Sequence, residues 1–215
     1  MKVFLKIFLS YLAFNYFSAC VNESPDNSDA NEIYRTNLGS ALIDLGYYSD
    51  AIRFYKKALK IYPNYPSGYI DLAFAYTKIG ALNSALAIYL KELNKKPDFF
   101  VLHSNVGFVY FQLGQFKKSI QHFKKAISLN RNEIYLYQNL INICFQAGYY
   151  AEAISPLKMI LKLKPEDFGA LEKLGVSYFK TGQIKKAVKT FNKILVFQPN
   201  NIEALTRLRI LLGKE

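Results

Sequence analysis

The sequence predicts an all-α fold of stacked helical hairpins, because the same residue types recur every 34 positions. Five successive segments repeat the pattern: 32–65, 66–99, 100–133, 134–167 and 168–201. One column is aliphatic and another is glycine: Leu38, Leu72, Val106, Leu140 and Leu174; Gly46, Gly80, Gly114, Gly148 and Gly182. A period of this length is typical of repeat proteins, in which each unit buries its apolar face against its neighbours.

Each unit is expected to contain two helices joined at its glycine. In the unit 66–99, apolar residues follow helical spacing on both sides of Gly80: Tyr69, Leu72, Ala73 and Tyr76, then Leu82, Ala85, Leu86, Tyr89 and Leu93. A further column of small residues lies in the second helix: Ala51, Ala85, Ser119, Ala153 and Ala187. Prolines end the second helices in four units: Pro63, Pro97, Pro165 and Pro199. Residues 202–215 continue the first-helix pattern without a partner, which predicts a capping helix and tail.

The order Tyr-x-x-Leu-Ala-x-x-Tyr, then Ala-x-x-x-Tyr, then Pro in the unit 66–99 resembles the tetratricopeptide repeat (TPR), whose period is also 34. The other units match comparably, so the resemblance covers residues 32–201. It implies a right-handed superhelix of five hairpins plus the capping helix. It also implies a binding function, in which the first helices line a concave groove.

In that family, positions two, five, nine, twelve and thirteen of each unit face the groove. Transferred by position, the expected lining includes Ile70, Phe74, Thr77, Ser104, Phe108, Phe111, Gln112, Gln138, Asn142, Phe145, Gln146 and Phe179. The basic residues with which chaperone-binding members clamp a carboxylate are missing, since Ser104 and Phe108 stand at two of those positions. Aromatic anchors flanked by amides favour an apolar or aromatic peptide segment as partner. The alternatives are that these rings pack between units, or that a tight superhelix shields them.

The fourth unit departs from the pattern at three positions. Ile141 replaces a small residue, Cys144 replaces an aromatic one, and Pro156 falls inside the second helix. A larger residue at the helix crossing should spread the pair, and an interior proline should kink the helix. Cys144 is expected to be a buried thiol. Drift and a functional bend explain this irregularity equally well.

The first residues, MKVFLKIFLSYLAFNYFSAC, have the layout of a secretory signal peptide over 1–19: two early lysines, an apolar stretch and small residues. The run Phe17-Ser18-Ala19-Cys20 resembles the lipobox of bacterial lipoproteins, although Phe17 departs from the usual aliphatic residue. The resemblance implies cleavage before Cys20, acylation of that cysteine and attachment to a lipid bilayer. An uncleaved anchor helix and simple secretion are the alternatives. Residues 20–31 are polar and turn-rich, which predicts a flexible tether.

The formal net charge is +12, and many lysines fall at outward-facing positions of the predicted second helices. This pattern fits a solvated outer surface or attraction to anionic lipid, and no nucleic-acid motif accompanies it. With two cysteines and two histidines the chain has no usual metal cluster, and we expect no enzyme activity, cofactor or small-molecule substrate. The sequence therefore predicts a lipid-anchored interaction scaffold of the bacterial cell envelope. A cytoplasmic TPR adaptor or co-chaperone is the alternative.

Overall fold

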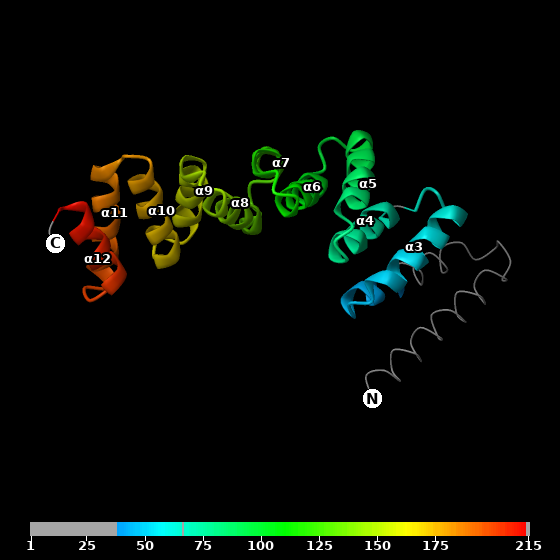
Figure 1. The fold of residues 1–215 in the computed structure, drawn as a ribbon, viewed down its shortest axis with the longest axis horizontal. Coiled ribbons are helices and arrows are strands. Elements are labelled where there is room, and N and C mark those ends of the chain that lie inside the picture. The colour runs from blue at the N-terminus through cyan, green and yellow to red at the C-terminus, as the bar shows by residue number, and fades with distance from the viewer. Residues whose placement is uncertain (1–37, 66, 214–215) are drawn as a thin grey trace, which may run out of the picture. The chain divides into compact units, whose positions relative to one another are not determined.

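The structure is a computed structural model that describes residues 38–65 and 67–213, and every regular element in this part is an α-helix (Figure 1). The predicted all-α class is therefore confirmed. The chain divides into two units, Met1–Pro97 and Asp98–Glu215, and each is described by itself. The predicted signal peptide, Cys20 and the tether lie outside the described residues.

The helices succeed one another as hairpins within each unit. In the first unit, residues 38–44 are helical and are followed by α3 (Tyr48–Ile61), α4 (Gly68–Lys78) and α5 (Leu82–Lys95). The second unit contains α6 (Phe100–Gln112), α7 (Phe116–Leu129), α8 (Ile134–Gln146), α9 (Tyr150–Leu163), α10 (Phe168–Lys180), α11 (Ile184–Phe197) and α12 (Ile202–Leu211). The helix α12 packs on α11 as the expected cap.

Glycine at each hairpin turn adopts the left-handed conformation that the pattern predicts. Gly114 has φ 71°, and the glycines of the other four turns have φ between 73° and 78°. After α6, the Gly114 N–H donates to the Phe111 carbonyl at 2.9 Å, and the Gln115 N–H donates to the Tyr110 carbonyl at 2.8 Å. This pair of bonds is the Schellman motif, which satisfies carbonyls at the helix end and reverses the chain.

Each second helix of the described part ends at a residue whose backbone leaves the helical region. Lys164 after α9 has φ −132° and ψ 84°, and Gln198 after α11 has φ −131° and ψ 78°. Pro165 and Pro199 follow directly. Proline disfavours the helical region for the residue before it, so the proline column both ends the helix and directs the chain into the next unit.

The two helices of a hairpin meet where a small residue faces a ring. A Cβ atom placed on Gly107 of α6 would lie 2.8 Å from the Phe123 ring of α7, and Phe123 is only 1% exposed. The same close contact joins Gly39 to Tyr55 and Gly175 to Phe191. These contacts explain why the first helix has a small residue at this column: a larger one would push the ring away.

Ser119, which stands in the alanine column, is accommodated by a hydrogen bond. Its side chain is fully buried in α7, and its Oγ donates to the Gly107 carbonyl of α6 at 2.7 Å. A buried hydroxyl is costly without a partner, and here the partner lies across the helix pair. The polar substitution therefore ties α6 to α7.

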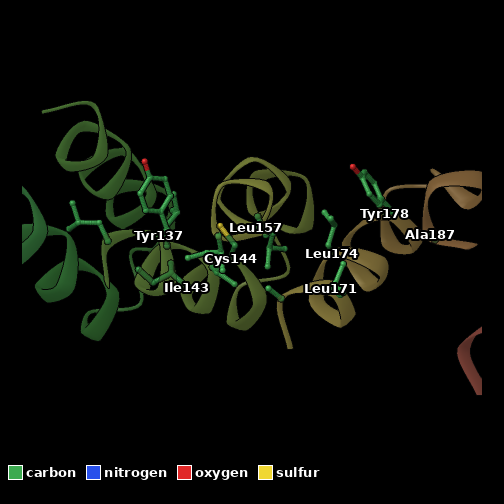
Figure 2. Packing of buried hydrophobic residues seen from close by; sticks show 14 of the residues in the cluster. Tyr137, Ile143, Cys144, Leu157, Leu171, Leu174, Tyr178 and Ala187 are labelled. Carbon is green, nitrogen blue, oxygen red and sulfur yellow. The ribbon is translucent and has the colours of Figure 1, made fainter. Parts of the chain in front are cut away.

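The fourth 34-residue repeat, residues 134–167, shows a compensating exchange at the same contact. Ile141 of α8 stands where the other described units have glycine or alanine, and Leu157 of α9 stands where they have tyrosine or phenylalanine. Ile141 is 4% exposed and Leu157 is 1% exposed, and both belong to the core of the second unit, in which Figure 2 labels Leu157. The larger residue thus meets a smaller one. Spreading of the pair, which the sequence led us to expect from Ile141 alone, is not needed to relieve a clash.

The helix α9 is continuous from Tyr150 to Leu163 despite the interior Pro156, which is buried. Cys144 of the neighbouring helix α8 is buried in the core, as predicted. Figure 2 shows its sulfur in the layer that also contains Leu157. Burial raises the pKa of the Cys144 thiol to about 12, and the nearby Glu152 carboxylate adds to this effect. The thiol therefore stays protonated and unreactive at neutral pH.

The substitution Gly107→Ala tests the contact between small residue and ring. Alanine favours a helix over glycine by up to about 1 kcal/mol, yet we expect a net loss of roughly 1–3 kcal/mol of unfolding free energy because Phe123 must move. In a Phe123→Leu background, which copies the fourth unit, the same substitution should cost nothing. Chemical denaturation of the wild type and the three variants measures the coupling, and an equal cost in both backgrounds would contradict this account.

Candidate functional site

The predicted groove residues of the second unit lie on its first helices, α6, α8 and α10. They are Phe108, Phe111, Gln112, Gln138, Asn142, Phe145, Gln146 and Phe179. Ile70 and Phe74 lie on α4 in the first unit, where both are half-buried and the Lys78 Nζ sits 5.0 Å from the Phe74 ring. The candidate site described below is confined to the second unit.

The phenylalanines of these helices differ in exposure. Phe108 is 40% exposed, with its ring centroid 6.4 Å from that of Phe111. Phe111 is half-buried and packs on Phe116 of α7 at 6.0 Å between centroids. Phe145 packs edge-on against Tyr150 of α9 at 5.3 Å. Phe108 therefore offers a ring to a partner, whereas the two others mainly join their own hairpins.

Phe179 on α10 is half-buried and packs against the core of the second unit. Two polar residues expected in the groove are instead turned into their helices. The Ser104 hydroxyl is buried and donates to the Val101 carbonyl at 2.9 Å, and the buried Thr77 donates to the Ala73 carbonyl at 2.9 Å. Neither hydroxyl is available to a ligand.

Exposed amide side chains lie on α6, the helix of Phe108, and on α8. The amide side chains of Gln112, Gln138, Asn142 and Gln146 are all exposed. Neither α6 nor α8 contains an Asp, Glu, Lys or Arg residue. An amide both donates and accepts hydrogen bonds, so this surface can pair with a peptide main chain without selecting for charge.

Lysines gather instead on the second helices. The helices α7, α9 and α11 contain ten exposed lysines against the single acid Glu152: Lys117, Lys118, Lys124, Lys125, Lys158, Lys162, Lys185, Lys186, Lys189 and Lys193. Some of them have local partners, since Lys124 pairs with Glu152 and the Lys118 Nζ lies 5.2 Å from the Tyr110 ring. The charge of the second unit is thus separated by helix, with neutral α6 and α8 and basic α7, α9 and α11.

Lys173 on α10 reaches across to α8, which the sequence did not predict. Its Nζ lies 3.5 Å from the Asn142 Oδ1 and 5.9 Å from the centre of the Phe145 ring. Lys173 stands at position six of its 34-residue repeat, which is not one of the positions that face the groove in the TPR family. Its contact with Asn142 nevertheless places Lys173 beside the predicted site.

A cavity of about 360 Å³ lies between α8, α9 and the start of α10. Its lining consists of Gln138, Asn139, Ile141, Asn142, Leu157, Ile160, Asp167, Gly169, Ala170 and Lys173. Two of these, Gln138 and Asn142, were predicted as groove residues. The cavity depends on side-chain sizes in three different helices, so no single column of the repeat could have revealed it.

The two histidines of the chain meet between α6 and α7. The Nδ1 atoms of His103 and His122 are 3.2 Å apart, and the Tyr110 ring lies 5.5 Å from that of His122. Burial lowers the pKa of His122 to about 4, and the neighbouring His103 adds to this effect. His122 is therefore neutral at pH 7.

Across residues 38–65 and 67–213, no helix combines the length and the apolar character needed to cross a membrane. In the same part of the chain, no three His, Cys, Asp or Glu side chains gather as a set of metal ligands.

A stack of helical hairpins with glycine turns and a terminal cap defines a helical-repeat protein. Family models of the tetratricopeptide repeat match residues 101–133 and 170–201, and a TPR repeat model matches residues 39–80. The chain is a TPR protein. Proteins of this kind serve as scaffolds for protein–protein interaction, and no catalytic family is indicated. None of the curated protein sequences matches the chain.

Several solved structures share the fold. MamA is 25% identical, with a TM-score of 0.65 over 80% of this chain and 94% of that one. YrrB, described as a TPR protein with an unusual peptide-binding site, is 23% identical, with a TM-score of 0.64 over 80% of this chain and 89% of that one. A thermophilic TPR protein from Thermus thermophilus is 23% identical, with a TM-score of 0.54 over 84% and 98%.

The histidine pair predicts a specific loss of stability in acid. Because the folded state lowers the pKa of His122 from 6.5 to about 4, the unfolded chain binds the proton more tightly between these values. The stability that comes from keeping His122 neutral is therefore fully present above pH 6.5, and it is lost as the pH falls toward 4. We expect the unfolding free energy to fall over this range by roughly 1–2 kcal/mol more in the wild type than in His122→Gln. Equal pH profiles for the two chains would refute the assignment.

Proposed function

We propose that this chain is a membrane-anchored TPR lipoprotein that acts as an interaction scaffold in the bacterial cell envelope. It binds an apolar or aromatic peptide segment on the face formed by α6, α8 and α10. The partner is another protein, and the bilayer is contacted through an acylated Cys20.

The observation that carries the peptide-binding part is the composition of α6 and α8. These helices contain no Asp, Glu, Lys or Arg residue, expose the Phe108 ring on α6 and carry exposed amides. Burying one large aromatic or aliphatic side chain is worth about 1.5–3 kcal/mol, which makes a partly exposed ring an effective anchor. The amides can then pair with the partner's main chain, since each offers a donor and an acceptor.

The relatives support the same class of ligand without identifying it. YrrB is described as binding peptide at an unusual site, and its fold is shared over most of both chains. The missing carboxylate clamp and the neutral first helices favour an apolar segment over an acidic chain end as the main anchor.

The anchor rests on the sequence of the first twenty residues. A positively charged start, an apolar stretch and small residues before Cys20 are the features that a lipoprotein signal requires. One acyl chain gives only marginal membrane affinity, so stable attachment needs more than one chain on the same cysteine. The polar residues 21–31 would then hold the folded part roughly 20 Å from the bilayer.

Phe108→Ala should weaken partner binding at least tenfold, because the exposed ring is the anchor and its removal leaves the hairpin core in place. A photo-crosslinker at position 112, one turn away, would capture the partner in intact cells. Phe197→Ala is the matched control, because Phe197 is also a partly exposed ring but lies at the end of the second helix α11. Undiminished crosslinking in the Phe108 variant would exclude this face as the site.

Cys20→Ser should release the protein from the membrane fraction and slow its processing, because serine cannot carry the thioether-linked lipid. Membrane fractionation and electrophoretic mobility of the full-length chain give the two readouts. The matched control is Cys144→Ser, since Cys144 is buried in the core and should not affect attachment. Retention of the Cys20 variant on the membrane, with unchanged mobility, would rule out lipidation.

A further inference from the structure

The cavity beside α10 arises because three columns of the repeat become smaller at the same junction. At the preceding junction, between α6, α7 and α8, the corresponding residues are large: Phe123, Tyr135 and Leu136. One period later they are Leu157, Gly169 and Ala170, and all three line the cavity. The exchange of Ile141 with Leu157 keeps the hairpin packed, while the reductions at Gly169 and Ala170 leave the neighbouring space open.

Packing does not require glycine at position 169. Gly169 lies in the first turn of α10, and a Cβ there would meet only the Asp167 Oδ1, at an ordinary 3.5 Å. Its φ does not lie in the left-handed region. A side chain such as the valine at the matching position of α6, Val101, would therefore fit without backbone strain. The space is a feature of this junction rather than a consequence of its backbone.

The cavity combines an apolar floor with a polar rim. Ile141, Leu157 and Ile160 are each no more than 5% exposed and form the floor. The amides of Gln138, Asn139 and Asn142 lie along α8. A volume of about 360 Å³ is near the lower end of ordinary ligand pockets, and it suits one side chain with its flanking main chain better than a large cofactor.

The two charged residues of the lining are not equivalent. Asp167 caps α10, because its Oδ1 accepts a hydrogen bond from the Ala170 N–H at 2.9 Å. Lys173 is the cation of the lining, and its ammonium is held by the amide oxygen of Asn142 at 3.5 Å rather than by a carboxylate. Its charge is therefore available to an anionic group at the edge of the cavity.

We propose that this cavity receives an apolar side chain of the partner peptide, with a neighbouring carboxylate of the same peptide paired to Lys173. The carboxylate belongs either to an acidic side chain or to the end of the peptide. This inference rests on the proposed peptide-binding function and adds a specificity pocket to it. Phe108 provides the anchor on α6, and the cavity selects the sequence of the segment that reaches α10.

The test is selection of random peptides displayed on phage against the full-length chain in detergent. Enriched peptides should pair an apolar residue with a carboxylate. The enriched peptides are then synthesised with the acidic side chain or its amide, and with a free or an amidated C-terminus. Comparing these forms distinguishes the two sources of the carboxylate. Lys173→Gln should weaken the carboxylate form at least tenfold and leave the amide form unchanged, whereas Lys189→Gln, at an exposed lysine on the second helix α11 outside the lining, should change neither.

Gly169→Val provides the second arm, because it fills the cavity without removing a polar group. It should abolish binding of the selected peptides while the melting temperature stays the same or rises. Selection without acidic and apolar residues, or equal binding to the Gly169 variant, would overturn the proposal. If Phe108→Ala weakens binding but Gly169→Val does not, the peptide-binding face stands and the pocket falls. If only Gly169→Val acts, the pocket stands and the anchor at Phe108 falls.

Discussion

Within a hairpin, the backbone of the first helix closely approaches an aromatic ring of the second helix. The structure depends on this contact. Gly107 meets Phe123 so closely that no Cβ fits between them, and Gly39 and Gly175 meet their rings in the same way. A buried aromatic ring contributes a large apolar area, and it can do so only if the opposite helix offers no side chain there. The period of 34 residues repeats this contact, and the glycine turns and prolines place the next pair in position.

The two helices of a hairpin differ in composition within the second unit. In the hairpin of α6 and α7, the buried ring of Phe123 fills the contact from the second helix, and Phe108 on α6 remains 40% exposed. The lysines follow the same division, since they lie on α7, α9 and α11 and leave α6 and α8 uncharged. We propose the binding face on these uncharged helices, and α10 adds Lys173 beside Asn142 at its edge.

The fourth 34-residue repeat shows what happens when both residues of this contact are replaced rather than one of them lost. Ile141 and Leu157, two residues of equal size, replace the usual pair of a small residue and a ring, and both remain buried in the hairpin. The ring that would have filled the junction with α10 is then absent, and Gly169 and Ala170 do not replace it. A position that looks like drift in the sequence thus coincides with the polar-rimmed cavity of the second unit.

The sequence by itself determined the all-α class, the hairpin repeat, the left-handed glycines and the buried Cys144, because each follows from local spacing within one unit. It also selected Phe108 and the exposed amides, since their positions repeat with the period. Only the tertiary structure decided that Phe111 and Phe145 turn toward their own hairpins, that Ser104 is buried, and that His103 meets His122. It also decided the cavity and the reach of Lys173 to Asn142, because these depend on side-chain sizes and distances across helices that are far apart in sequence.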